Sequence, residues 1–487
     1  MKQLENKIML ITYPDSLGGS LHSLEAVVNR YFKDAVGGIH ILPFYPSSGD
    51  RGFAVVEYGR VDPAWGTWED IDRLADRYAL AADFMLNHIS SQSKEFIDYM
   101  AKGDDSEYRD MFIRWDEFWP DGEPSQQELD ALYRRRPGGG PFHVYTRDDG
   151  KKVRLWNTFF EQQVDINPFS KAAQDYYDRN LGEISRHVPL IRFDAFAYAS
   201  KKPGTSCFFV EPEIWDVLDI AMKPLRKTGT QMLAEIHENY RIQQKMAERG
   251  YWVYDFALPM LLLHATMTGR SDRLIHWMNI CPRNQFTTLD THDGVGVIDA
   301  AGLLEEEEIE TVAEKVESRT ALAQKYIQNA SMIRKGGKKA VRYQLAGTFY
   351  SIMDCDDDAY LLARAVQYFA PGIPQVYYVG MLAGENDIEF VKNGGEGRGL
   401  NRHNYTIPEI EQAVMRPVVQ RLLKLSKFRN SHPAFSGDFW VDGNQNDGIL
   451  HIVRTCSAER AELIADFSVN RFKILFSEAG KMQEFIL

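Results

Sequence analysis

Residues 189–196 of the chain read PLIRFDAF, a short apolar run that contains an arginine and an aspartate near its end. Similar runs recur along the chain, and they are apolar throughout instead of alternating with polar residues. This composition is typical of strands that are buried on both faces, as in a parallel sheet. The eight expected strands are Lys7–Tyr13, Gly38–Phe44, Ala81–His88, Pro189–Phe196, Gln231–His237, Trp252–Leu258, Phe286–His292 and Ile373–Gly380.

Helical patterns lie between these strands. Residues 22–32, 67–78 and 417–428 each carry apolar side chains at intervals of three and four residues, which predicts amphipathic helices. The acidic run Glu305–Glu308 is expected to be the solvated N-terminus of another helix. Eight strands alternating with helices predict an α/β fold, a closed (β/α)8 TIM barrel. A doubly wound open sheet is the alternative, but no GxGxxG motif follows the first strand.

Uneven strand spacing predicts two inserted subdomains. Long gaps follow the third and the seventh strands, and loops of that length carry either structure of their own or a function. After about Ser436 the sequence alternates between apolar and polar residues at 439–443, 448–455, 460–467 and 472–476, which predicts a small antiparallel domain. The expected divisions are 1–87, 169–293 and 356–435 for the barrel, 88–168 for domain B, 294–355 for domain B′ and 436–487 for the C-terminal β domain.

Composition restricts the class of protein. The chain has 487 residues, 44% of them hydrophobic, and its 56 basic and 69 acidic side chains give a formal charge of −13. That hydrophobic fraction excludes general disorder, and the acidic balance argues against a nucleic-acid partner. We expect neither a signal peptide nor a membrane span, because no apolar run approaches the roughly 20 residues that a span requires. The four cysteines are scattered, which favours reduced thiols and a cytoplasmic location over disulfides or a zinc site.

Polar side chains gather where the expected strands end. These are Asp83, Asn87 and His88 on the third strand, Arg192 and Asp194 on the fourth, Glu235 and His237 on the fifth, and His292 and Asp293 on the seventh. Any one of them alone is more simply a loop residue or a helix cap. Four strand ends together favour an active site, because barrel enzymes place theirs at the carboxyl ends of the strands. We expect Arg192 to pair with Asp194, since residues two apart project to the same side of a strand.

Several segments resemble a known enzyme family. DFMLNH (83–88), IRFDAFAY (191–198), AEIHENY (234–240) and TLDTHDG (288–294) are similar to the four short motifs of the retaining α-amylase superfamily. The resemblance narrows to its sucrose phosphorylase branch and extends over nearly the whole chain. The segments that carry this narrower resemblance include LITYPDSLGG (10–19), GIHILPFYPSSGDRGFA (38–54), GTSCFFVEPEIWD (204–216) and PGIPQVYYVGMLAGEND (371–387).

This resemblance implies a retaining double displacement. By motif position, Asp194 would be the nucleophile, Glu235 the acid and then the base, and Asp293 a residue that holds sugar hydroxyls and favours the transition state. A retaining pair of carboxyl groups lies about 5–5.5 Å apart, and the acid needs a raised pKa. The glucosyl-binding residues implied by the resemblance are Asp50, Phe53, His88, Phe159, Gln163, Arg192, His292 and Arg398.

A phosphorylase also needs a site for its second substrate. The resemblance implies an α-glucoside donor with inorganic phosphate as co-substrate, no cofactor and no metal, and it allows a homodimer. It assigns the phosphate and acceptor contacts to Arg136, Val341, Arg342, Tyr343 and Gln344. Arginine suits this role because its donor fork matches phosphate oxygens. A solvated basic turn is the simpler interpretation of the run that contains Arg136.

One position departs from the pattern of the branch. Sucrose phosphorylases usually carry an aspartate two positions before the tyrosine of this loop, whereas this chain has Val341 followed by Arg342. The sequence therefore leaves the leaving group open between fructose, fructose 6-phosphate and glycerol. The expected function is a sucrose-type glucoside phosphorylase that forms glucose 1-phosphate. The alternatives are a hydrolase or transglucosidase, and a non-catalytic amylase-fold protein, which the presence of all three acids disfavours.

Overall fold

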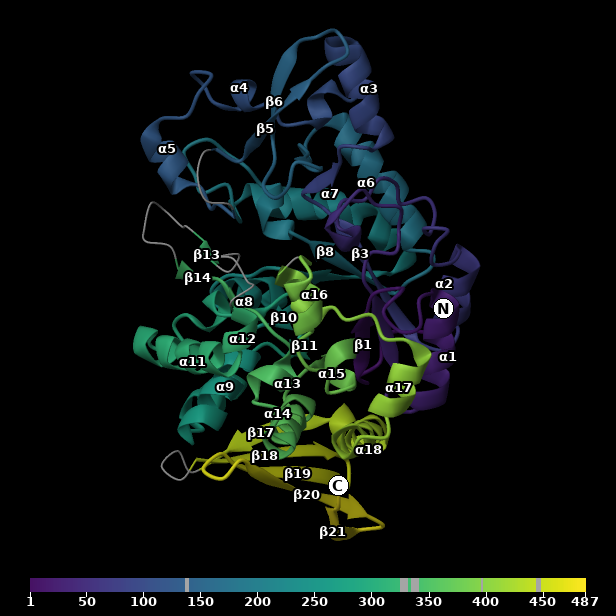
Figure 1. Ribbon diagram of the computed structural model, residues 1–487, viewed down its shortest axis with the longest axis vertical. Helices are drawn as coiled ribbons and strands as arrows, with labels where there is room; N and C mark the ends of the chain where they lie inside the picture. Colours follow the sequence, from purple (N-terminus) through teal and green to yellow (C-terminus); the bar gives the residue numbers. More distant parts are fainter. Residues whose placement is uncertain (136–139, 325–331, 334–340, 396, 444–447) are drawn as a thin grey trace. The chain divides into compact units, whose positions relative to one another are not determined.

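The computed structural model (Figure 1) describes residues 1–135, 140–324, 332–333, 341–395, 397–443 and 448–487. Eight parallel strands form a closed barrel in the order β1-β16-β11-β10-β9-β8-β3-β2. Their bounds are Met9–Thr12 (β1), Gly38–Ile41 (β2), Ala79–Met85 (β3), Leu190–Asp194 (β8), Gln231–Ala234 (β9), Trp252–Asp255 (β10), Gln285–Thr288 (β11) and Ile373–Tyr377 (β16). Each expected strand contains or overlaps one of these, so the TIM-barrel prediction is confirmed.

Burial on both faces explains why the barrel strands are continuously apolar. Every residue of β3 is buried, and so are the first four residues of β8. The two strands pair in parallel with Asp83 opposite Arg192 and Met85 opposite Asp194. This register brings a buried acid and a buried base side by side within the barrel wall.

The predicted helices form, and polar residues cap the N-termini of several of them. Ser20 caps α1, Thr67 and Asp70 form a capping box on α2, and Glu305 and Glu308 do the same for α11. The helix bounds are Leu21–Tyr31 (α1), Trp68–Ala75 (α2), Lys94–Lys102 (α3), Trp115–Phe118 (α4), Gln126–Ala131 (α5), Lys171–Ile184 (α6), Glu213–Thr228 (α7), Arg241–Glu248 (α8), Leu258–Thr268 (α9), Asp272–Ile280 (α10), Glu306–Arg319 (α11), Ala321–Gln324 (α12), Phe349–Ile352 (α13), Asp357–Phe369 (α14), Tyr378–Met381 (α15), Ile388–Lys392 (α16), Ile407–Ala413 (α17) and Pro417–Ser431 (α18). None of the described helices could cross a bilayer, because none is both long and apolar enough.

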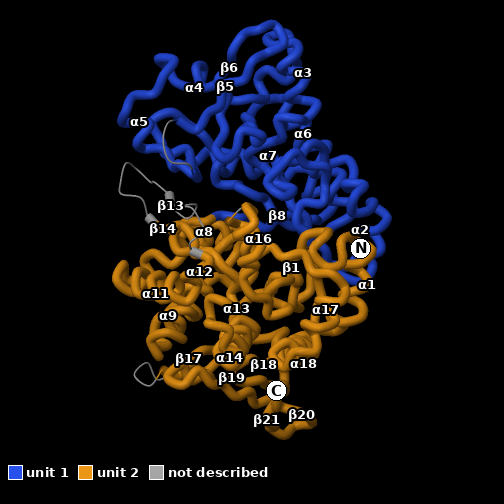
Figure 2. The backbone as a smooth tube through the Cα atoms, viewed as in Figure 1, with its two compact units in different colours: residues 1–3, 41–236, 332–341 blue, residues 4–40, 237–331, 342–487 orange. Residues whose placement is uncertain are grey.

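The chain divides into two compact units (Figure 2), which are described separately. Unit 1 comprises Met1–Gln3, Ile41–Ile236 and Met332–Val341. Between β3 and β8 it contains α3–α6, the antiparallel pair β5 (Phe142–Thr146) and β6 (Lys152–Trp156), and the pair β4 (His88–Ser90) and β7 (Gln163–Asp165). A cluster of buried side chains forms the core of this segment: Trp115, Trp119, Leu132 and Trp156, joined by Cys207 from the chain after β8.

Unit 2 comprises Leu4–His40, His237–Ser331 and Arg342–Leu487. It includes the short pair β12 (Val295–Gly296) and β15 (Gln344–Leu345) and the C-terminal antiparallel sheet. That sheet has five strands, β17 (Asp438–Asp442), β18 (Ile449–Cys456), β19 (Glu459–Asp466), β20 (Arg471–Glu478) and β21 (Lys481–Phe485). Four strands match the predicted alternating segments. The sequence did not predict β21, because four of its five residues are exposed.

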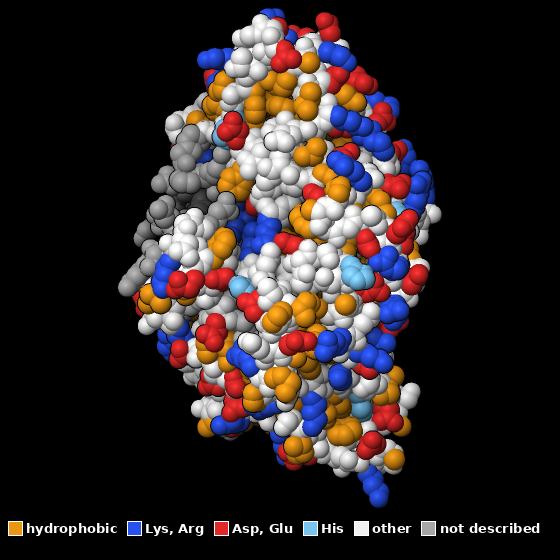
Figure 3. All heavy atoms as spheres, turned by 45° about the vertical axis from the view of Figure 1, so that its right-hand side comes forward, with side chains coloured by type: hydrophobic (Ala, Val, Ile, Leu, Met, Phe, Trp, Pro, Cys, Tyr) orange, Lys and Arg blue, Asp and Glu red, His pale blue; other side chains and the backbone are white. Residues whose placement is uncertain are grey.

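The short strands β13 (Met332–Ile333) and β14 (Val341–Arg342) form a further pair. Figure 3 shows acidic and basic side chains interspersed on the face that it draws.

Candidate active site

In unit 1, three carboxylates surround one guanidinium. Asp83 is buried within β3, Asp194 is the last residue of β8, and Glu235 directly follows β9. Arg192 Nη1 donates hydrogen bonds to Asp83 and to Asp194 Oδ1, the latter at 2.8 Å, while its Nη2 lies 3.9 Å from Glu235 Oε1. The expected pairing of Arg192 with Asp194 is therefore confirmed. The cluster carries more acidic than basic groups, so retention of a proton is favoured.

The pKa of Asp194 reflects this excess of acid. Burial raises it to about 8, the positive charge of Arg192 opposes the rise, and the charges of Glu235 and Asp83 add to it. A group with such a shift at the end of a barrel strand is typical of catalytic sites. The protons of groups this closely coupled belong to the cluster and not to one residue.

The backbone after Asp194 turns sharply and orients Glu235. Ala195 has φ of 53°, in the left-handed region that non-glycine residues rarely adopt, and strain of this kind concentrates at functional sites. The Ala195 N–H donates to Glu235 Oε2 at 3.0 Å. This hydrogen bond gives the Glu235 carboxyl group a defined orientation.

A second group of polar side chains in unit 1 is fixed on the backbone carbonyl of Phe53. His88 Nε2 lies 3.0 Å from that oxygen, and Gln163 Nε2 donates to it at 3.3 Å and to Asp50 Oδ2 at 3.1 Å. Burial lowers the pKa of His88. His88 Nδ1 is buried without a hydrogen-bond partner among the described residues. If Nε2 carries the proton that the carbonyl needs, Nδ1 is an acceptor for a hydroxyl group.

Aromatic rings line the same part of unit 1. Phe53 lies 5.8 Å from the Arg192 guanidinium, and the Phe159 ring contacts His88 and Tyr198 at centroid distances of 5.5 and 5.3 Å. Tyr198 is buried and lies in the segment IRFDAFAY, although the sequence did not single it out. Rings in this arrangement provide the apolar wall on which the face of a sugar can pack.

A buried lysine, also missed by the sequence, supports these walls. Lys201 Nζ lies 2.8 Å from Asp165 Oδ2 and donates to Asn87 Oδ1 at 2.7 Å and to the Tyr198 carbonyl at 2.6 Å. Asp165 in turn accepts hydrogen bonds from Thr158. Lys201 therefore compensates a buried carboxylate and fixes the turns next to His88 and Phe159. Its side-chain partners, Asp165 and Asn87, lie far away in the sequence, so no local pattern could have identified it.

In unit 2, the loop after β11 carries Asp293 in a cationic environment. Arg398 Nη1 and Arg402 Nη2 lie 3.6 and 3.7 Å from Asp293 Oδ1, and His292 Nε2 lies 3.6 Å from Oδ2. Burial by itself would raise the pKa of Asp293. The charges of His292, Arg398, Arg402 and His237 outweigh burial and hold that pKa well below its ordinary value. Asp293 is therefore ionised wherever the protein is folded and near neutral pH.

Backbone hydrogen bonds keep the Asp293 loop in place. Asn401 Nδ2 donates to the carbonyls of Thr291 and Asp293 at 3.2 and 2.9 Å, and Arg402 Nε donates to that of His292 at 2.9 Å. Asp293 Oδ1 is buried, yet it accepts no hydrogen bond from any described residue. A buried acceptor in this state is a candidate contact for a ligand hydroxyl group.

A buried ion pair holds the end of β11 that precedes this loop. Arg364 on α14 pairs with Asp290, and it also donates to the Tyr360 hydroxyl and to Gln367 Oε1. A Cβ atom at Gly380 would lie 1.9 Å from Asp290 Oδ2. Glycine is therefore required at this position for the backbone to pass the pair.

The residues that the resemblance assigns to the acceptor lie in several different environments. Arg342 forms ion pairs with Glu310 and Glu317 on α11, the first at 3.0 Å. Tyr343 is buried, and Gln344 pairs with Gly296 across β12 and β15. The backbone of Val341 begins β14. The predicted phosphate ligand Arg136 lies outside the described residues.

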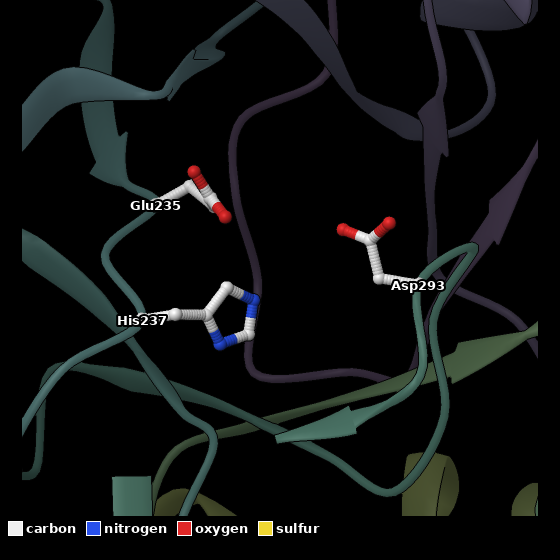
Figure 4. A group of neighbouring side chains, drawn as sticks. All are labelled: Glu235, His237 and Asp293. Atoms are coloured by element: carbon white, nitrogen blue, oxygen red, sulfur yellow. The ribbon is translucent and has the colours of Figure 1, made fainter. Parts of the chain in front are cut away.

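Figure 4 shows Glu235, His237 and Asp293, the one group among the described residues whose ligand atoms could hold a metal ion. Two of the three are the carboxylates to which the sequence assigned acid–base and stabilising roles. The third, His237, directs Nδ1 to Asp299 at 3.0 Å.

The raised pKa of Asp194 predicts a pH-dependent gain in stability on its removal. The folded protein releases this proton near pH 8, whereas an unfolded chain releases it near 3.8, so ionisation of Asp194 lowers the free energy of unfolding as pH rises between these values. We expect Asp194→Asn to be more stable than wild type by about 1–3 kcal/mol at pH 8, with a smaller difference at pH 5. Urea unfolding at both pH values measures it.

A matched change at the exposed Asp442 serves as the control and should show no such trend. A difference that shrinks or reverses between pH 5 and pH 8 would contradict the raised pKa.

Comparisons with known proteins identify the family. Residues 19–203 match the family model described as the alpha amylase catalytic domain. The chain is 46% identical over 438 residues to sucrose phosphorylase from Streptococcus mutans, covering 89% of each chain. It is 43% identical over 447 residues to glucosylglycerol phosphorylase from Marinobacter adhaerens, covering 92% of each.

The structural comparison agrees. The crystal structure of sucrose 6F-phosphate phosphorylase from Thermoanaerobacter thermosaccharolyticum superposes with a TM-score of 0.94 at 40% identity, covering 100% of this chain and 99% of that one. Relatives of this similarity, matched over almost their full lengths, confirm the resemblance seen in the sequence. The chain belongs to the sucrose phosphorylase branch of the retaining α-amylase superfamily, and it is an enzyme of that type.

Proposed function

We propose that this protein transfers the α-glucosyl group of sucrose to inorganic phosphate, giving α-glucose 1-phosphate and fructose. The observation that carries the proposal is the cluster in which Arg192 pairs with Asp194 while the Ala195 amide fixes Glu235. A nucleophile and an acid at consecutive barrel strands are what a retaining glycoside mechanism needs. The relatives named above, all phosphorylases, support phosphate as the second substrate.

The reaction proceeds in two displacements with balanced proton transfers. The Asp194 carboxylate attacks the anomeric carbon and forms a glucosyl ester, while Glu235 gives its proton to the departing fructosyl oxygen. A phosphate oxygen then attacks the same carbon, the ester bond breaks, and Glu235 takes the proton that the phosphate releases. Asp293 remains ionised and accepts hydrogen bonds from sugar hydroxyls as positive charge develops on the ring.

This mechanism assigns the proton of the acidic cluster to Glu235 when the donor binds. Arg192 stabilises the negative charge on Asp194 through its 2.8 Å hydrogen bond. The Ala195 amide donates to Glu235 Oε2 and so orients this carboxyl group for proton transfer. Partition of one shared proton between two acids in different surroundings is how retaining enzymes separate nucleophile from acid.

The contacts of Arg342 favour an uncharged leaving group. A free guanidinium in the acceptor loop would suit a phosphorylated fructose, but Glu310 and Glu317 already engage this one. Two carboxylates outweigh one positive charge, so the local field does not favour a further anion. Glucosylglycerol is the second candidate donor, because a 43% identical relative is a glucosylglycerol phosphorylase.

A donor panel tests this function. The purified enzyme is incubated with phosphate and, separately, with sucrose, sucrose 6′-phosphate or glucosylglycerol, and glucose 1-phosphate is measured. We expect sucrose to give the highest kcat/KM and turnover to depend on phosphate. Release of glucose at the same rate without phosphate would instead identify a hydrolase, and preference for either other donor would correct the leaving group.

Replacement of the acid should separate the two half-reactions. Glu235→Gln should lose nearly all activity on sucrose, since fructose leaves only with a proton. The variant should still react with α-glucosyl fluoride, whose leaving group needs none, and azide should then accelerate turnover because this anion needs no base. Fluoride release and glucosyl azide are the measured quantities. Failure of both behaviours would move the acid–base role to another residue, with Glu238 the nearest candidate in the sequence.

The ion pairs of Arg342 predict a small role in donor choice. Arg342→Ala should change the ratio of kcat/KM for sucrose 6′-phosphate to that for sucrose by less than about threefold, since surface ion pairs contribute little. The double variant Glu310→Gln/Glu317→Gln should raise the same ratio by releasing the guanidinium. A tenfold or greater loss on sucrose 6′-phosphate alone in Arg342→Ala would show that this arginine recognises the phosphorylated sugar.

A further inference from the structure

A buried histidine–aspartate pair lies beside the predicted acceptor residues in unit 2. His237 follows Glu235 by two positions and is buried, and its Nδ1 lies 3.0 Å from Asp299 Oδ2. Asp299 belongs to the short helix η5 (Ile298–Ala300) and is also buried. Its other oxygen accepts a hydrogen bond from Gln243 Nε2 at 3.4 Å. The carboxylate therefore has a defined orientation toward the imidazole.

The imidazole ring is held on both sides. The Phe256 ring stacks on His237 with a centroid distance of 4.0 Å and an angle of 20°. The Tyr343 ring meets it edge-on at 5.5 Å and 70°. Tyr343 is one of the residues predicted to face the acceptor. The pair thus fixes the ring against which this tyrosine packs.

Gly296 connects the pair to the acceptor residues. A Cβ atom at this position would lie 2.3 Å from Asp299 Oδ2 and 3.3 Å from His237 Nδ1, so the backbone crosses directly over their hydrogen bond. Gly296 pairs with Gln344, and the next residue, Val297, donates its N–H to the Tyr343 carbonyl at 2.9 Å. The strand pair β12–β15 therefore places the backbone of Tyr343 and Gln344 next to the histidine–aspartate pair.

We propose that Asp299 is a positioning residue for the phosphate acceptor: it accepts the Nδ1–H of His237 and so orients the ring, whose Nε2, on the opposite side, contacts the incoming phosphate. A carboxylate at one ring nitrogen fixes the orientation of the imidazole and the hydrogen-bonding role of its other nitrogen. This inference rests on the proposed phosphorolysis and assigns a residue to its second step.

A double-mutant cycle tests whether Asp299 acts through His237. The four proteins are wild type, Asp299→Asn, His237→Gln and the double variant, and kcat/KM for phosphate is measured at saturating donor. Loss of a hydrogen bond to a charged group should cost at least about tenfold in each single variant. The double variant should be no slower than His237→Gln, because neither change removes anything further once the other is made.

A second readout separates positioning from a general structural effect. Fluoride release from α-glucosyl fluoride without phosphate reports formation and hydrolysis of the glucosyl-enzyme. Asp299→Asn should lower kcat/KM for phosphate by a factor at least about five times larger than the factor by which it lowers the rate of fluoride release. The matched control is Glu462→Gln, which makes the same change in a histidine–glutamate pair of the C-terminal sheet, 2.8 Å from His451, and should alter neither rate.

Specific outcomes would overturn the proposal. These are multiplicative losses in the double variant, equal losses in the phosphate and fluoride assays, or no loss in Asp299→Asn. If Asp299→Asn does not fold, Gly296→Ala takes its place in the cycle, because its Cβ would displace the Asp299 carboxylate. If wild type forms no glucose 1-phosphate from any donor, the proposed function has failed, and that result is distinct from failure of the cycle.

Discussion

The hydrogen bonds of Arg192 to Asp83 and Asp194 are the constraint on which the site in unit 1 depends. The strand register sets Asp83 opposite Arg192, so the guanidinium is fixed by the barrel wall and not by a loop. One positive charge cannot neutralise the three carboxylates around it. The resulting excess of acid raises the pKa of Asp194 and keeps a proton in the cluster. A barrel that is rigid elsewhere can tolerate this unfavourable arrangement where chemistry requires it.

The loop after β11 has the opposite electrostatic character. Cationic side chains surround Asp293, so its pKa is lowered while that of Asp194 is raised. Chemically similar groups thereby obtain different states from different environments, as acid–base catalysis requires. The ion pair of Arg364 with Asp290 and the backbone hydrogen bonds of Asn401 hold the loop with few degrees of freedom. Pre-organised charge of this kind costs no rearrangement during the reaction.

Family membership indicates the type of reaction, but it does not indicate the leaving group. The relatives matched over nearly their whole lengths include phosphorylases named for sucrose, sucrose 6F-phosphate and glucosylglycerol. Identities between 40 and 46% do not separate these three donors. Residues predicted to face the acceptor, such as Arg342 and Tyr343, are therefore the ones at which this distinction is tested. An arginine whose charge is compensated by two glutamates attracts a phosphate group less than an unpaired arginine does. The sequence alone does not distinguish these two states.

The sequence alone determined the barrel, its flanking helices and the acidic residues at the strand ends. Apolar runs, helix periodicity and capping residues are local signals, and parallel strands must bring their carboxyl ends to the same end of a barrel. Only the tertiary structure identified Lys201 as the partner of Asp165, and Glu310 and Glu317 as the partners of Arg342. It also paired His237 with Asp299 and placed Gly296 over them. These contacts join residues far apart in the chain and follow no period, so they exist only once the backbone has folded.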